Sequence, residues 1–324
     1  MHQKIAIIFL PIYLVVLFLM VGFGVFLPES VAAAPRVRAA VIFQEKLSQH
    51  QQVVGLLRAG FKDVAEIDLQ FLPINGELSQ TQLAQLPASD FLVAIGSRAL
   101  SLALEKGREM PGLYVLASEP ELLKLASNSG RWQGLAFTVP FKTQLEVIKD
   151  LLPGVRRVAL VYGQGQQEQA LAFRRAADEL GFEADISLVT KRNSFVVIDR
   201  LYRRCDLFFM MPIPGLINRV TLQKMFELQA RTRRPLVGLS ARFVKFGALL
   251  SINYTLEAVG DYLVDELRNL VVKGEPAGLL ANDKKSQENL YTVFLNPKRA
   301  ALLSVEIKSN LKERVVLVDV GGTR

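Results

Sequence analysis

Short, continuous apolar segments alternate with amphipathic helical segments along most of this chain, and this alternation constrains the fold more than any other feature. In the first half, the segments Arg38–Phe43, Asp90–Gly96 and Gly112–Pro120 are strand-like, and helical patterns follow the first two. The strands of a parallel sheet are buried on both faces by the helices that connect them. We therefore predict an α/β fold built on parallel sheets.

The same alternation begins again after Trp132. A helical segment, Thr143–Gly154, precedes the strand-like Arg156–Gly163, and the pattern continues with a helix over Gln166–Leu180 and the strand-like stretches "DISLVT", "DLFFMMP" and "PLVGLS". With 324 residues, half of them hydrophobic, the chain is too long for one compact domain of ordinary size. We predict two doubly wound parallel-sheet lobes joined by a hinge.

The first 33 residues have the layout of a secretory signal. Met1–Lys4 carries positive charge, Ile5–Phe26 is almost wholly apolar, and the small residues of "VAAA" permit cleavage after Ala33. A stretch of about 22 apolar residues is also long enough to cross a bilayer, so an uncleaved anchor is the alternative. We expect export to the periplasm and a mature chain that begins at Ala34 or Pro35.

Cysteine and histidine usage excludes several kinds of chemistry. Cys205 is the single cysteine, so no internal disulfide can form, and its place before "DLFFMM" predicts a small buried apolar residue. After loss of the signal only His50 remains, which argues against histidine-based triads and histidine-rich metal sites. We expect His50 on a solvated helix face, and we predict no catalytic residue, metal or cofactor.

The charge of the chain does not indicate nucleic acid. The formal charge is +8, but the basic residues occur in ones and twos without a basic tract or a recognised motif. The segment "GQGQQ" resembles a dinucleotide loop, yet Glu168 stands where the third glycine would be and Thr190 ends the next strand without an acidic residue. Two alternatives remain for this loop: an anion site with Gln164, Gln166 and Gln167 as donors, or a tight turn with solvated glutamines.

Candidate ligand residues follow from the ends of the predicted strands. In parallel sheets, ligands collect at the carboxyl ends of the strands, where loops meet helix N-termini. No paired carboxylates at catalytic spacing stand out there, so a binding role is favoured over an enzyme. The residues at these ends are Gln44, Ser97, Ser118, Gly163, Gln164, Gly165, Gln166, Pro214 and Ser240.

Several runs of sequence carry a resemblance to a known family. They include "VAIGSRALSLAL", "LYVLASEP", "GRWQGLAFTVPFKTQLEVIKDLLPGVRRVALVYG", "RRPLVGLSARFVKFGALLSINYTLEAVGDYLVDELRNLVVKGEPA" and "LNPKRAALLSVEI". In order and spacing these resemble the substrate-binding proteins of ABC transporters, of the type I periplasmic binding fold that includes tryptophan-binding and other aromatic amino-acid-binding members. The resemblance covers essentially the whole mature chain.

The resemblance implies a domain plan. After the signal (1–33), residues 34–137 with about 255–280 would form one lobe, and 138–254 with about 281–320 the other. The polar segment Ser240–Phe246 would be hinge and cleft wall, the alternative being a surface loop without a ligand role. The helix Leu256–Lys273 would return to the first lobe.

The resemblance also implies a function. We expect an exported, monomeric solute-binding protein that closes on a small molecule, amino-acid-like in the family, and delivers it to an ABC permease. The alternative is a membrane-anchored periplasmic sensor that kept the fold. This chain has Met211–Pro214 where relatives often carry an Asp, so a free amino group would need Glu45 or Glu119 as its counter-charge.

Overall fold

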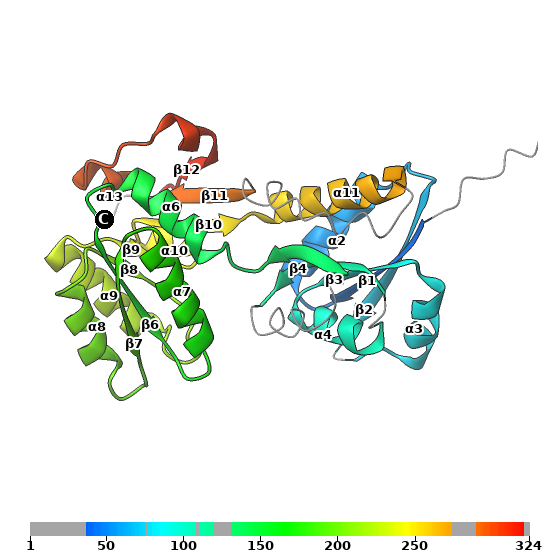
Figure 1. Cartoon of the computed structure of the whole chain (residues 1–324), viewed down its shortest axis with the longest axis horizontal. Coiled ribbons are helices and arrows are strands. Elements are labelled where there is room, and N and C mark those ends of the chain that lie inside the picture. Colours follow the sequence, from blue (N-terminus) through cyan, green and yellow to red (C-terminus); the bar gives the residue numbers. More distant parts are fainter. Residues whose placement is uncertain (1–36, 76, 108–109, 119–130, 274–289, 321–324) are drawn as a thin grey trace, which may run out of the picture.

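The computed structural model describes residues 37–75, 77–107, 110–118, 131–273 and 290–320, and these form two lobes that each contain one sheet (Figure 1). The first sheet has the strand order β2-β1-β3-β4-β5, and the second has the order β12-β11-β10-β9-β8-β6-β7. The predicted signal, residues 1–33, lies outside the described residues.

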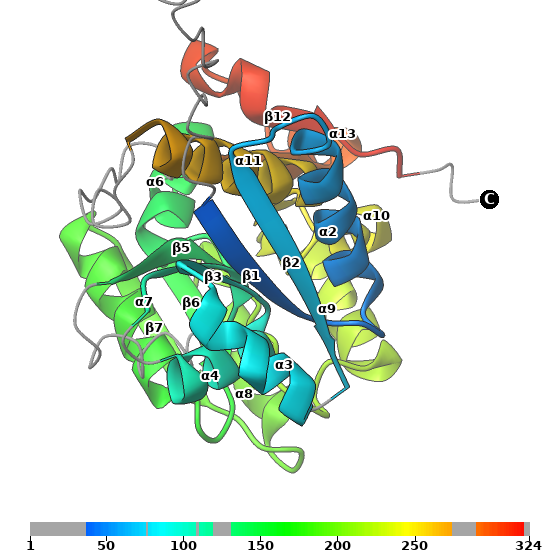
Figure 2. The ribbon, with the colours of Figure 1, turned by 90° about the vertical axis from the view of Figure 1, so that its right-hand side faces the viewer.

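All the strands of the first sheet are parallel, and helices cover both of its faces. Helix α11 follows the second-lobe strand β10 in sequence, but it packs beside α2 on the first sheet (Figure 2). The elements of this lobe are β1 (Val37–Gln44), α2 (Ser48–Gly60), β2 (Ile67–Ile74), α3 (Gln80–Gln85), η1 (Leu86–Ala88), β3 (Phe91–Ile95), α4 (Ser97–Lys106), β4 (Gly112–Ala117), β5 (Trp132–Ala136) and α11 (Leu256–Lys273).

The second sheet is mixed, because β11 runs antiparallel to β10 while the other strand pairs are parallel. Its elements are α6 (Phe141–Leu151), β6 (Arg157–Tyr162), α7 (Gln167–Glu179), β7 (Glu183–Leu188), α8 (Ser194–Tyr202), β8 (Leu207–Phe209), α9 (Arg219–Thr232), β9 (Leu236–Val237), α10 (Ala241–Phe246), β10 (Leu250–Tyr254), β11 (Tyr291–Leu295), α13 (Pro297–Leu302), η3 (Ser309–Arg314) and β12 (Val315–Leu317).

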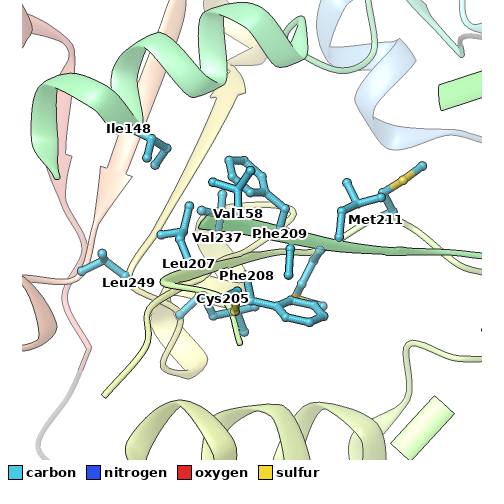
Figure 3. Packing of buried hydrophobic residues seen from close by; sticks show 14 of the residues in the cluster. Ile148, Val158, Cys205, Leu207, Phe208, Phe209, Met211, Val237 and Leu249 are labelled. Atoms are coloured by element: carbon cyan, nitrogen blue, oxygen red, sulfur yellow. The ribbon is translucent and has the colours of Figure 1, made fainter. Parts of the chain in front are cut away.

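Aromatic and aliphatic side chains fill the core of the second lobe (Figure 3). Phe173 of α7 is fully buried and makes edge-to-face contacts with Phe141 and Phe209, with ring centroids 5.3 Å and 5.0 Å away. Such pairs stabilise a core beyond the area they bury. Cys205 is a free thiol within this core, as predicted, and burial raises its pKa to about 12.

Two described segments connect the lobes. The chain leaves β5 through Phe137–Pro140 to reach α6, and it returns from β10 through Thr255 to reach α11. Tyr254, at the end of β10, packs against the hydrophobic clusters of both lobes. Burial, with a smaller electrostatic contribution from Tyr114, raises the pKa of Tyr254 to about 12.

The expectation that Ser240–Phe246 is a hinge between the lobes is wrong. Residues Ala241–Phe246 form α10, which stays within the second lobe beside β10 and β11. Val244 is fully buried there, and Phe243 packs against the second-lobe core. These two apolar side chains hold the segment on its own lobe, and the crossing lies further along the chain, at Thr255.

Candidate functional site

The carboxyl ends of the parallel strands of both lobes face the junction between the lobes. β5 is parallel to its neighbours, and its carboxyl end leads directly to the second lobe. β10 is parallel to β9, and its carboxyl end leads directly back to the first lobe (Figure 1). We call the carboxyl ends of β1, β3, β4 and β5 the first edge, and those of β6, β7, β8, β9 and β10 the second edge. Ligands of open α/β sheets bind at such edges.

Ser97 and Ser118 meet at the first edge, where β3 and β4 end. The Ser97 hydroxyl donates to Ser118 Oγ over 2.8 Å, and the backbone N–H of Ser118 donates to Ser97 Oγ over the same distance. Ser97 Oγ is therefore occupied as both donor and acceptor. The Ser118 hydroxyl keeps its own proton, so Ser118 can donate to a ligand while Ser97 fixes its position.

His50 lies beneath the first edge, and the prediction of a solvated His50 is wrong. It is 2% exposed, and its Nδ1 accepts the backbone N–H of Gln44 over 3.3 Å. A Cβ added at Gly96 would lie 2.3 Å from His50 Cε1, so the ring fills the space that this glycine leaves open. Burial lowers the pKa of His50, which favours the neutral ring that the bond to Gln44 requires. His50 thus links the end of β1 to the loop that carries Ser97.

Gln166 closes the loop after β6 at the second edge. Its Oε1 accepts the backbone N–H of Gly163 over 2.9 Å, and its Nε2 donates to the carbonyl oxygen of Pro212 over 2.9 Å. The amide is therefore engaged with the backbone and ties the β6 loop to the β8 loop. Gln166 therefore positions the loop with one N–H and its oxygen, and the second N–H of its amide stays a predicted ligand donor together with the exposed Gln164.

The two glycines of this loop have different requirements. A Cβ at Gly163 would lie 2.8 Å from Ile213 Cγ2, so this glycine permits close packing against the β8 loop. Gly165 has φ of 83° and open space around it, so its backbone conformation, rather than approach by a neighbour, favours glycine. The helix that follows, α7, carries Glu168 in its first turn.

Pro214 and Ser240 also lie at the second edge. Pro214 is exposed in the loop between β8 and α9, next to Gly215, whose added Cβ would lie 3.2 Å from Lys191 Cε. Lys191 therefore extends along this loop. Ser240 is half-buried and precedes α10, and the Asn253 amide donates to the neighbouring carbonyl of Leu239 over 2.9 Å.

The structure thus brings the candidate residues together in two groups. Gln44, Ser97 and Ser118 share the first edge, linked through His50 and by their own hydrogen bonds. The second group shares the second edge and consists of Gly163, Gln164, Gly165, Gln166, Pro214 and Ser240. Glu119, a predicted counter-charge, lies outside the described residues.

Membrane spans and metal clusters are two further features that concern the part of the chain that the structure describes. None of its helices is both long and apolar enough to cross a membrane. No group of three or more His, Cys, Asp or Glu side chains there is placed to hold a metal ion.

No protein-family model matches the sequence, and no curated protein matches it. Solved structures do match. The ligand-free, open structure of a substrate-binding protein with adhesive properties from Clostridium difficile has a TM-score of 0.64 at 16% identity, over 88% of this chain and 100% of that chain. The chain has the fold of ABC-transporter substrate-binding proteins.

Two ligand complexes share this substrate-binding-protein fold. One is an ABC domain with L-Trp from Streptococcus pneumoniae, with a TM-score of 0.51 at 16% identity over 87% of this chain and 100% of that chain. The other is an ABC-transporter substrate-binding protein with Leu from Desulfitobacterium hafniense, with a TM-score of 0.54 at 15% identity over 76% and 87%. The fold predicted from the sequence is confirmed, and none of these three proteins is named as an enzyme.

Proposed function

We propose that this protein is the exported solute-binding component of an ABC-type importer. The observation that carries the proposal is the opposition of two sheet edges, each furnished with hydrogen-bonding groups, across the junction of two lobes. Ser118 offers a hydroxyl donor from the first lobe, and Gln164 offers an exposed amide from the second. A small molecule held between them would contact both lobes at once and favour their closed arrangement.

The connections between the lobes support a closing motion. The described crossings consist of Phe137–Pro140 and the single residue Thr255. Short segments that absorb a change of backbone angles while two rigid sheets keep their shape are the usual hinges of domain closure. Tyr254 packs on both clusters and would serve as the pivot between them.

The proposed location is the periplasm, with an ABC permease as partner and a monomer as the working unit. Export rests on the signal-like residues 1–33. A membrane-anchored sensor of the same fold is the second candidate, because the apolar stretch Ile5–Phe26 is long enough to cross a bilayer. A soluble protein with its N-terminus at Ala34 or Pro35 supports the importer, whereas full-length protein that only detergent extracts supports the sensor.

A ligand screen followed by small-angle scattering tests the proposal. A ligand at about 100 times its Kd should raise the free energy of unfolding of residues 34–324 by about 2.7 kcal/mol, which a thermal-shift screen of amino acids, organic acids and sugars detects. Saturation with a compound found in this way should reduce the radius of gyration. An unchanged scattering profile at saturation would contradict closure.

A further inference from the structure

The second edge carries an excess of positive charge. Up to the crossing at Thr255, the loops of this edge and the first turns of the helices that follow them contain four cations and one carboxylate, that of Glu168. All five of these side chains belong to exposed residues. The four cations are Lys191, Arg192, Arg219 and Arg242.

Two of these cations have a defined place. Lys191 lies along the loop that contains Pro214 and Gly215, as the 3.2 Å approach of its Cε to an added Cβ shows. Arg242 is the second residue of α10, and its guanidinium lies 5.5 Å from the ring centroid of Phe246, one turn further along the same helix. The first turn of α7, a helix of 13 residues, adds the positive end of a helix dipole at the same edge.

The carboxylates near the first edge already have partners. Glu45 accepts from the Asn75 amide over 3.4 Å, and Glu77 lies 3.9 Å from the Arg98 guanidinium. At the crossing, Glu257 accepts from the Gln52 amide over 3.0 Å. Ser118 supplies a hydroxyl donor at this edge. Among the described residues, donors and cations are therefore available to a ligand more readily than carboxylates.

These edges would stabilise the charge of a bound carboxylate more than that of a bound ammonium group. A charge that loses water must be compensated by an opposite charge or by several hydrogen bonds. A carboxylate would find Ser118, Lys191 and Arg242, and hydrogen bonds assisted by charge are about twice as strong as neutral ones. Among the described residues near the first edge, an ammonium would share the carboxylate of Glu45 with the Asn75 amide, or that of Glu77 with the Arg98 guanidinium.

We infer that this site binds an organic anion, a carboxylate or a similar acid, that carries no ammonium group. The inference rests on the proposed function, because it assumes that a small molecule binds between the two edges. The inferred ligand class differs from the ligands in the two structures of the same fold, L-Trp and Leu.

A matched series of small molecules tests the charge preference. Each series has one carbon skeleton: 4-methylpentanoate, L-leucine and L-leucinamide, and likewise 3-(indol-3-yl)propanoate, L-tryptophan and L-tryptophanamide. Further mono- and dicarboxylates, paired in the same way with amines, widen the panel. The assay is the thermal shift of residues 34–324, followed by calorimetric titration of each compound that stabilises the protein.

We expect the stabilising compounds to be carboxylates without an ammonium group, with Kd values at least about tenfold lower than those of the matching amino acids. Equal or stronger binding of an amino acid or an amide overturns the inference and leaves the proposed function standing. Failure of every carboxylate also overturns the inference. Failure of every compound in this panel and in the screen of amino acids, organic acids and sugars counts against the proposed function as well.

A charge-reversal variant locates the effect. Lys191→Glu combined with Arg242→Glu should weaken binding of the selected carboxylate by at least about tenfold, with the melting temperature of the unliganded protein nearly unchanged. Arg174→Glu combined with Arg175→Glu, on the exposed face of α7, makes the same change of net charge in the same lobe and should leave Kd within about twofold. Equal weakening in both variants would show only a general effect of charge and would overturn the inference.

Discussion

Replacing Gln166 with alanine should destabilise the second lobe by about 1.5–3.5 kcal/mol. The side chain makes two hydrogen bonds to the backbone, from the N–H of Gly163 and to the carbonyl of Pro212, both 2.9 Å long. Gly163 is buried, so its unpaired N–H would cost about 1–3 kcal/mol, whereas water can replace the partner of the exposed Pro212 at a cost of about 0.5 kcal/mol. The sum is a large fraction of the stability of an ordinary domain.

Urea unfolding of residues 34–324, followed by far-ultraviolet circular dichroism, measures this loss. Gln164→Ala is the matched control, because this exposed side chain of the same loop makes no hydrogen bond to any described residue, and its removal should change stability by less than about 0.5 kcal/mol. Gln166→Glu keeps the acceptor for Gly163 and loses the donor to Pro212. Its loss of unfolding free energy should therefore lie between those of Gln164→Ala and Gln166→Ala. Equal effects of Gln164→Ala and Gln166→Ala would refute the bridging role of Gln166.

Three further predictions concern buried residues. Lowering the pH from about 8 to about 5 should reduce the free energy of unfolding, because burial lowers the pKa of His50 in the folded protein. The stability that the neutral ring contributes is complete above the ordinary pKa of 6.5 and is lost as the pH falls toward the lower pKa of the folded state. His50→Gln should therefore flatten the pH profile of urea unfolding. Phe173→Ala should lower the unfolding free energy by about 3–5 kcal/mol, and Phe195→Ala, 42% exposed, by less than about 0.5 kcal/mol; similar losses would contradict the assigned core. Gly134→Ala should disrupt the pairing of β5, since its Cβ would lie 1.7 Å from a carbonyl oxygen of β4, while Gly154→Ala, with nothing within 4 Å, should leave the melting temperature unchanged.

The sequence predicted most of the strands inside the sheets and the edge strand β7, and it missed the edge strands β2 and β12. β1, β3 and β6 are apolar runs because helices cover both of their faces. β2 was not predicted: it lies at the edge of the first sheet, is partly exposed along its length and contains Pro73. β12, also an edge strand, has three residues and two exposed apolar side chains. Half-exposed strands lack the continuous apolar signal on which the prediction depended.

The site was predictable only as far as strand direction determines it. Parallel topology places Ser97 and Ser118 side by side, and their hydrogen bonds follow from that placement. The burial of His50 and the backbone contacts of Gln166 depend on the paths of loops, which residue periodicity does not describe. α10 was missed because six residues with alternating charge and aromatic character have no repeat long enough to indicate a helix.

The position of α11 in the chain has a consequence for the order of folding. α11 supplies Val259, Tyr262, Leu263 and Leu267 to the core of the first lobe, yet it is synthesised after β6 to β10 of the second lobe. A nascent chain that ends at Tyr254 therefore has the strands of the first sheet but lacks the helix that packs beside α2, and the apolar face of α2 stays open to solvent. Such surfaces aggregate or recruit chaperones. The first lobe cannot complete its core until α11 has been synthesised. A fragment of residues 37–136 should therefore not fold as an independent unit.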